Sequence, residues 1–165
     1  DIGVGNDFRR IGLMRNPTDF GTTTVATATT RRQIYAAVFS SVSGTFTADE
    51  EINQASTGAV GKVVEYDATN KLLYWYQTRF PDVGTDSDGN ATAFSGANAI
   101  TGQSSSAAAT PLTSSSTDVN GVSITSGYSN PELAADSGDI IYVEERSPIT
   151  RASDQTENIK LIIEF

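Results

Sequence analysis

The 165-residue chain contains no His and no Cys, and these two absences exclude many functions. Without imidazole or thiol, the chain has no Ser-His-Asp or Cys-His catalytic group. Zinc sites of Cys and His, haem on a His or Cys ligand and iron–sulfur clusters held by Cys are excluded as well. Disulfides cannot form, so packing and backbone hydrogen bonds have to stabilise the fold. Any remaining chemistry would have to use carboxylates, hydroxyls, Lys, Arg or a metal held by oxygen ligands, and we expect no cofactor and no assigned metal.

Positive charge is scarce and is concentrated near the N-terminus. Lys and Arg number 11 against 20 Asp and Glu, for a formal net charge of −9. Residues 1–45 contain five Arg and three Asp, whereas the rest of the chain contains six basic and 17 acidic residues. This balance disfavours nucleic-acid binding, which needs basic side chains to displace phosphate counterions. A solvated surface is the preferred interpretation of this asymmetry. The functional alternative is a self-complementary or partner-facing surface, because opposed charged patches steer protein assembly.

Long hydrophobic runs are absent too, and none approaches the ~20 residues of a membrane span. Apolar residues make up 38% of the chain, while Ser and Thr number 18 and 21. A chain rich in Thr and Gly and poor in Leu favours strands and turns. We expect a single all-β domain over residues 1–165, a layered β-sandwich with one or two short helices in its loops, and no membrane partner.

The clearest local signal is a β-hairpin over residues 62–78. Two apolar segments, 62–66 and 72–76, flank the polar turn at residues 67–70. The length of this turn and its residues both fit a hairpin. Both faces of the second strand are apolar, so we expect it to be covered on two sides. One face carries Leu72, Tyr74 and Tyr76, and the other carries Leu73 and Trp75.

Other elements follow from alternation and from turn residues. Residues 8–14, 33–39, 139–145 and 159–165 are expected to be strands, with 33–39 also open to a helical reading. Asn130-Pro131-Glu132 predicts the start of a short helix, because an N-cap residue, a proline and an acid follow one another.

Residues 81–130 are expected to form a long Ser/Thr/Ala-rich loop or insertion. They contain no Lys or Arg and two Ser triplets. Long polar stretches of this kind usually run over the surface. Short strands near residues 94–100 and 122–125 would hold the segment in place.

Residues 46–56 and 94–104 share one spacing, in which Phe is followed by Ile six residues later and by Ser four residues after that. Chance in a chain of biased composition explains this similarity at least as well as a repeat. A real repeat would place a Phe-anchored extended segment before a turn in each copy.

Three groups of acidic residues resemble functional sites, and each has a simpler interpretation. Alternate oxygen side chains at residues 86–90 resemble the start of a calcium loop, but Ala97 stands where an EF-hand needs its Glu, and a solvated Asp-Gly turn is preferred. The acidic residues at 49–51 are expected to be solvated. A hydrolase using Glu144 and Glu145 is remote, because adjacent acids on a strand point to opposite faces.

An aromatic platform at residues 74–76 would suit a glycan-binding adhesin or fibre-type module, since aromatic rings stack on the apolar faces of sugars. Polar ligands would then come from Asp86, Asp88 and Asn90. Core packing is the preferred interpretation of Trp75, and an interface role for one face of the strand is the intermediate one.

The two ends of the chain together resemble a known family. The N-terminal motif is FRRIG at residues 8–12, followed by Asn16-Pro17. The C-terminal motif is SGDIIYVEERSPI at residues 137–149, followed by DQTE at 154–157 and a final apolar strand. In order and spacing these motifs resemble the baseplate wedge subunit encoded by gene 8 of T-even-like contractile-tailed bacteriophages. They span about 45 residues, and residues 18–130 show no counterpart.

The resemblance implies a non-enzymatic structural protein that joins neighbouring wedge proteins in the phage tail baseplate. It implies a homodimer in the full-length protein, of which this chain would be the C-terminal domain. The implied location is the virion, after assembly in the host cytoplasm. We expect contact surfaces on the Arg-rich N-terminal segment and on the aromatic hairpin. The expected interface residues are Arg9, Arg10, Arg31, Arg32, Tyr74, Trp75, Tyr76 and Arg146.

Overall fold

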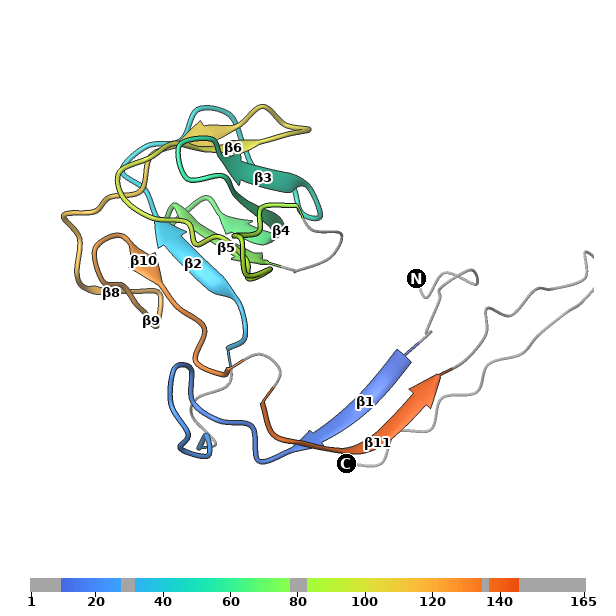
Figure 1. The fold of residues 1–165 in the computed structure, drawn as a ribbon. Coiled ribbons are helices and arrows are strands. Elements are labelled where there is room, and N and C mark those ends of the chain that lie inside the picture. Colours follow the sequence, from blue (N-terminus) through green and yellow to red (C-terminus); the bar gives the residue numbers. More distant parts are fainter. Residues whose placement is uncertain (1–9, 28–31, 78–82, 135–136, 146–165) are drawn as a thin grey trace, which may run out of the picture. The chain divides into compact units, whose positions relative to one another are not determined.

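A computed structural model describes residues 10–27, 32–77, 83–134 and 137–145 (Figure 1). Every element of regular secondary structure among these residues is a β-strand, so the all-β class is confirmed. The sequence predicts one domain, whereas by internal packing the chain divides into two compact units, because each unit pairs its strands within itself. The larger unit is residues 17–137, and the smaller unit is residues 1–16 with 138–165.

The larger unit is built on a seven-stranded antiparallel sheet with the order β10-β2-β5-β4-β3-β6-β7. The strands of this unit are β2 (Tyr35–Val38), β3 (Glu51–Gln54), β4 (Ala59–Asp67), β5 (Leu72–Tyr76), β6 (Ile100–Gly102), β7 (Ala108–Ala109), β8 (Asp118–Val119), β9 (Val122–Ser123) and β10 (Tyr128–Ser129). Strand β2 confirms the strand interpretation of residues 33–39.

The sheet curls so that β7 and the residues after it meet the chain at the end of β2. The backbones of Ser43 and Ala108 exchange two hydrogen bonds of 2.9 Å, and the Leu112 N–H donates to the Val38 carbonyl at 2.8 Å. Opposite sides of the curled sheet therefore face each other across a shared core, which confirms the layered, sandwich-like arrangement.

Strands β4 and β5 form the predicted hairpin. In its turn, Asp67 Oδ1 accepts hydrogen bonds from the backbone N–H groups of Thr69 and Asn70 at 2.9 and 3.0 Å. The Asn70 side chain donates to Asp67 Oδ2 at 2.6 Å, and this bond is the main reason that the pKa of Asp67 is lowered. Lys71 completes the turn with a positive φ of 53°.

Strand β5 is covered on both faces, as its two apolar faces predict. Leu73 and Trp75 lie in the main core, whereas Leu72 and Tyr74 lie in a smaller cluster on the opposite face. Val122 of the β8–β9 hairpin is buried in that smaller cluster. The hairpin therefore forms a further layer on the outside of the sheet.

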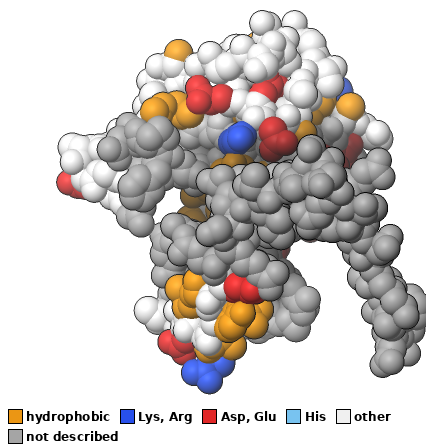
Figure 2. Space-filling view, turned by 90° about the vertical axis from the view of Figure 1, so that its right-hand side faces the viewer, with side chains coloured by type: hydrophobic (Ala, Val, Ile, Leu, Met, Phe, Trp, Pro, Cys, Tyr) orange, Lys and Arg blue, Asp and Glu red, His pale blue; other side chains and the backbone are white. Residues whose placement is uncertain are grey.

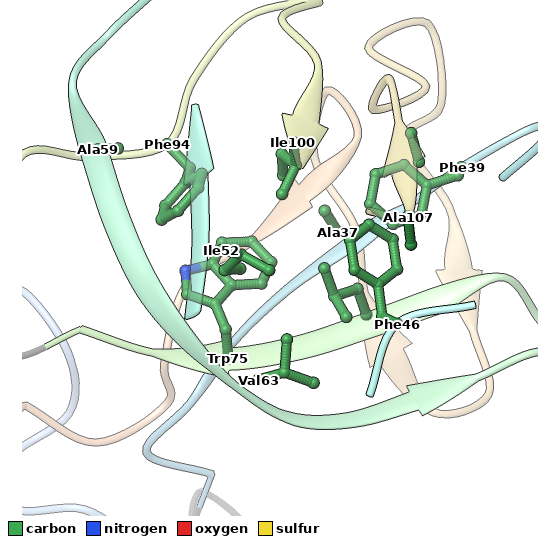
Figure 3. Packing of buried hydrophobic residues seen from close by; sticks show 12 residues of the cluster. Ala37, Phe39, Phe46, Ile52, Ala59, Val63, Trp75, Phe94, Ile100 and Ala107 are labelled. Atoms are coloured by element: carbon green, nitrogen blue, oxygen red, sulfur yellow. The ribbon is translucent and has the colours of Figure 1, made fainter. Parts of the chain in front are cut away.

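Trp75 lies in the main core and is 1% exposed. Its ring stacks on Tyr35 with 5.8 Å between centroids and meets the ring of Phe94 edge-on at 5.1 Å. Figure 3 shows Trp75 and Phe94 directed into the same core. Gly61 leaves the space for the indole, because a Cβ there would lie 2.7 Å from Trp75 Cδ1.

The two segments of repeated spacing occupy equivalent places. Phe46 and Phe94 are both buried in the main core. Ile52 on β3 and Ile100 on β6 are fully buried, and the two strands pair antiparallel with Ile52 opposite Gly102. A turn follows each strand, so each copy is a Phe-anchored segment before a turn, as the repeat predicts.

Glu50 is 5% exposed, so the expectation that the whole 49–51 cluster is solvated is wrong at this residue. Its Oε2 accepts hydrogen bonds from the N–H groups of Ser104 and Ser105 at 3.1 and 2.9 Å. Its Oε1 accepts from Ser105 Oγ at 2.8 Å and from the Thr47 N–H at 2.6 Å. Burial raises the pKa of Glu50, but these hydrogen bonds outweigh burial and hold the pKa below its ordinary value.

Gln54 is fully buried and links β3 to the segment before β6. Its Nε2 donates to the Asn98 carbonyl at 2.9 Å and to Tyr128 Oη at 3.2 Å. Its Oε1 accepts from the Ser95 N–H at 2.8 Å and from Thr57 Oγ1 at 2.9 Å. The amide thus has partners for both of its donors and for its oxygen, as a buried polar group requires.

Residues 83–130, most of the expected loop or insertion, supply β6 to β10. Strand β9 lies where a short strand is expected near residues 122–125, whereas β6 begins only at Ile100, the last residue of the other expected segment. Phe94, Ile100 and Ile124 from this segment are buried. The strands are only two or three residues long, so they leave little alternation in the sequence.

The helix expected at residues 130–135 is wrong in its described part, where residues 130–134 are not helical. The N–H groups of Glu132 and Leu133 donate to the Arg32 carbonyl at 2.6 and 3.1 Å. Glu132 Oε2 accepts from the Arg32 N–H at 2.8 Å, and Leu133 forms a β-bridge with Asp19. These long-range hydrogen bonds override the local helix-start signals.

Trp75→Ala is expected to lower the free energy of unfolding by about 3–5 kcal/mol, because it leaves a cavity in the aromatic core. Urea denaturation followed by far-UV circular dichroism measures the change. Tyr76→Ala, at the half-buried neighbour, is the matched control and should cost less. A loss below about 1 kcal/mol for Trp75→Ala would contradict the burial of the indole.

Glu50→Gln is expected to destabilise the protein by about 2–3 kcal/mol near neutral pH, because an amide cannot accept all four hydrogen bonds. The folded-state pKa is lowered, so this contribution is present above the ordinary carboxyl pKa of about 4.3 and is lost as the pH falls through the folded-state value. The difference between wild type and Glu50→Gln should therefore shrink in acid. Glu51→Gln, at the exposed neighbour, is the control, and an equal loss there would refute the assignment.

Candidate interaction surface

The described part of the smaller unit is a two-stranded antiparallel ribbon. Strand β1 (Arg10–Arg15) pairs with β11 (Asp139–Glu145), which matches the strand predicted at residues 139–145. Pairing brings the N-terminal and C-terminal motifs side by side (Figure 1). Arg15 Nη2 donates to Asp139 Oδ2 at 3.3 Å, but both side chains are more than half exposed. Such an exposed ion pair adds little stability.

Apolar side chains on this ribbon lie in solvent. Residues 140–143 of β11 form a continuous apolar run, from Tyr142 at 48% to Ile140 at 71% exposure. On β1, Leu13 and Met14 are exposed as well. Figure 2 shows hydrophobic side chains on the surface beside acidic and basic ones at the lower end of the view. Exposed apolar patches of this kind mark interaction surfaces.

The structure places two of the five basic residues that we expect at an interface. Arg10 lies on β1 opposite Glu145, in the ribbon itself. Arg32 lies in the larger unit, just before β2. The other three, Arg9, Arg31 and Arg146, lie outside the described residues.

Arg32 is tied into the larger unit. Its Nη2 donates to Ser129 Oγ and to the Asn130 carbonyl at 2.7 Å each, and its Nη1 donates to the Ile34 carbonyl. Burial lowers the pKa of Arg32, and the negative charge of Glu132 opposes that shift. With this many internal partners, the guanidinium fixes residues 129–132 beside β2.

The three aromatic residues of β5 do not form one platform. Trp75 is buried, which confirms the core-packing interpretation. Tyr74 packs against the smaller core cluster, and burial raises the pKa of its phenol. Tyr76 is half-buried. Successive residues of a strand point to opposite faces, so both tyrosines lie on the face away from the indole.

The turn at residues 86–90 is held by its own hydrogen bonds. Asp86 Oδ1 accepts from the N–H groups of Asp88 and Asn90 at 3.0 and 2.8 Å, as in a solvated Asp-Gly turn. Within the described ranges, no group of three or more acidic side chains is arranged to hold a metal ion. No helix in that part of the chain is long and apolar enough to cross a membrane.

Comparison with protein families gives one match. The phage Gp8 family model, described as bacteriophage T4 Gp8, matches residues 67–165, more than half of the chain. The chain belongs to the phage Gp8 family. The gene 8 family suggested by the two terminal motifs is thereby confirmed. No curated protein and no solved structure matches the chain.

The match to the Gp8 family extends further than the motifs suggest. Residues 67–130, which show no counterpart by motif, lie inside the matched range, whereas the N-terminal motif lies outside it. The family-matched part of this Gp8 protein therefore begins in the turn before β5 and includes β11, but not β1. Strand β11 is the part of the exposed ribbon that the family model covers.

Sequence reasoning identified residues 139–145 as a strand but did not predict its exposure. A run of four apolar residues is ordinarily a sign of burial on both faces. One sequence feature could have indicated exposure of this strand: the apolar run is followed directly by two acidic residues, Glu144 and Glu145.

Proposed function

We propose that this protein is a structural subunit of a phage tail baseplate, where it joins neighbouring wedge proteins through protein–protein interfaces and catalyses no reaction. The observation that carries the proposal is the match to the Gp8 family over residues 67–165. The apolar run of β11 lies inside that range and is exposed, which supports a role in binding.

The chemistry of the chain supports a non-catalytic role. No His or Cys is present in the whole sequence. Glu50 is a buried carboxylate, but its pKa is lowered and both oxygens are occupied by hydrogen bonds. A general acid needs a pKa raised toward the working pH, so Glu50 is suited to structure rather than to proton transfer.

The proposal includes a homodimer of the full-length protein, located in the virion baseplate after assembly in the host cytoplasm. These points rest on the resemblance of the terminal motifs to gene 8 wedge subunits. A stable protein interface buries about 1,200–2,000 Å² in total. The exposed ribbon would therefore be one part of a larger contact.

A glycan-binding adhesin has less support. Such a module needs aromatic rings on its surface, but Trp75 is buried and Tyr74 packs into a core cluster. The polar turn at residues 86–90 satisfies its own backbone N–H groups. No observation on the described residues favours the adhesin over the baseplate subunit.

Immunogold electron microscopy of purified phage particles tests the proposed function. An antibody against this protein is expected to label the baseplate end of the tail. Particles grown without the protein should lack complete baseplates, and expression of the wild-type chain from a plasmid should restore them. Labelling only at fibre tips, or complete baseplates without the protein, would count decisively against the proposal.

A further inference from the structure

The β8–β9 hairpin of the larger unit turns on an Asn-Gly pair. Val119 pairs with Val122, so Asn120 and Gly121 form a two-residue turn. Both have a positive φ, 49° and 76°, as a type I′ turn requires. Both are exposed, and a Cβ placed on Gly121 would have no atom within 4 Å. The turn is therefore open to water and hydroxide.

An asparagine followed by a glycine has a side-chain amide that its own main chain can attack. The nitrogen of the next residue can bond to the asparagine Cγ, and glycine lacks the Cβ that would hinder this approach. Of the nine asparagines in the chain, only Asn120 is followed by Gly. Asn16 and Asn130 precede prolines, which have no N–H to supply the attacking nitrogen. Asn120 is therefore the asparagine best placed to react.

The carboxylate of Asp67 holds the side-chain amide of Asn120. Asn120 Nδ2 donates to Asp67 Oδ2 at 3.3 Å, which joins the β8–β9 turn to the turn between β4 and β5. Asp67 is charged at neutral pH, because its acidic pKa is lowered further, mainly by the hydrogen bond from the Asn70 side chain. An aspartate at residue 120 would bring two carboxylates together, and like charges at this distance repel. The link between the two turns thus depends on the amide.

We propose that Asn120-Gly121 is a site of spontaneous deamidation, and that this modification releases the β8–β9 hairpin from the outside of the sheet. The Gly121 nitrogen gives its proton to hydroxide and bonds to Asn120 Cγ. The Cγ–Nδ2 bond breaks, and the leaving nitrogen takes a proton from water, departs as ammonia and regenerates hydroxide. Water then opens the resulting succinimide ring to aspartate or isoaspartate, with no oxidation or reduction.

Either product weakens the attachment of the hairpin. Aspartate carries a charge toward Asp67, and isoaspartate carries the same charge and adds one carbon to the main chain, which no longer fits a two-residue turn. Val122 and Ile124 are buried in the smaller core cluster with Leu72 of β5. Release of the hairpin would uncover this apolar face irreversibly. The inference goes beyond the proposed function and does not depend on it.

Mass spectrometry of the full chain, incubated at mildly alkaline pH, tests the modification. Tandem spectra should locate a gain of one dalton at Asn120, at a rate that rises with hydroxide concentration. Asn90 is the internal comparison, because it is also exposed but is followed by Ala91. Asn120 should react at least tenfold faster than Asn90. A rate at Asn120 no greater than that at Asn90 would overturn the assignment of the site.

Hydrogen exchange tests the release of the hairpin. Asn120→Asp installs one product, whereas Asn120→Gly removes the amide without adding charge and keeps a pair that suits a type I′ turn. The Ile124 amide, which donates to the Thr117 carbonyl at 3.1 Å, should exchange several-fold faster in Asn120→Asp than in Asn120→Gly. Adding Asp67→Asn to Asn120→Asp should reverse most of this increase, and the Ile52 amide should be unchanged throughout. Equal exchange of the Ile124 amide in the two single variants would overturn the proposed release.

Discussion

A buried carboxylate and a buried amide, one just before β3 and one at its end, determine how the larger unit closes. Gln54 forms hydrogen bonds with Ser95 and Asn98, which precede β6. Glu50 accepts hydrogen bonds from Ser104 and Ser105, which follow β6. A buried charge is tolerated only where hydrogen bonds replace its water, and the N–H groups of two successive serines do so here. This constraint places β6 beside β3, and β7 can then reach residues 39–43 and close the sheet around the aromatic core.

Secondary structure could be predicted from the sequence where it depends only on residues close together in the chain. The hairpin of β4 and β5 follows from alternation and from turn residues that bond to each other, so its sequence predicts it without tertiary information. The same holds for β11. Burial of Trp75 follows from a strand that is apolar on both faces. The family could also be identified, because the sequence motif that begins at residue 137 is long and its residues follow in a specific order and spacing.

The remainder depends on contacts between distant segments. Pro131 and Glu132 read as a helix start, but the backbone of Arg32 pairs with this segment and keeps it from becoming a helix. The sequence predicts a solvated Glu50 because three of its four hydrogen bonds come from Ser104 and Ser105, more than 50 residues away. For the candidate surface, the residues expected from charge and aromaticity include Trp75, which is buried, and Arg32, whose guanidinium is bonded to its own unit. The apolar run at residues 140–143 is exposed. Its exposure depends on which other segments of the chain pack against it, and the local sequence pattern carries no information about that.

The central claim is that Glu50 and Gln54 make the larger unit one cooperative scaffold, and native-state hydrogen exchange at Ser95, Ser104 and Ser105 tests it most directly. Amides in loops ordinarily exchange through small local openings. Because these three N–H groups donate to the buried side chains, they are expected to exchange only through global unfolding, with the same free energy as the amide of Ile52. Exchange of these amides at rates typical of exposed loops, while Ile52 remains protected, would contradict the account.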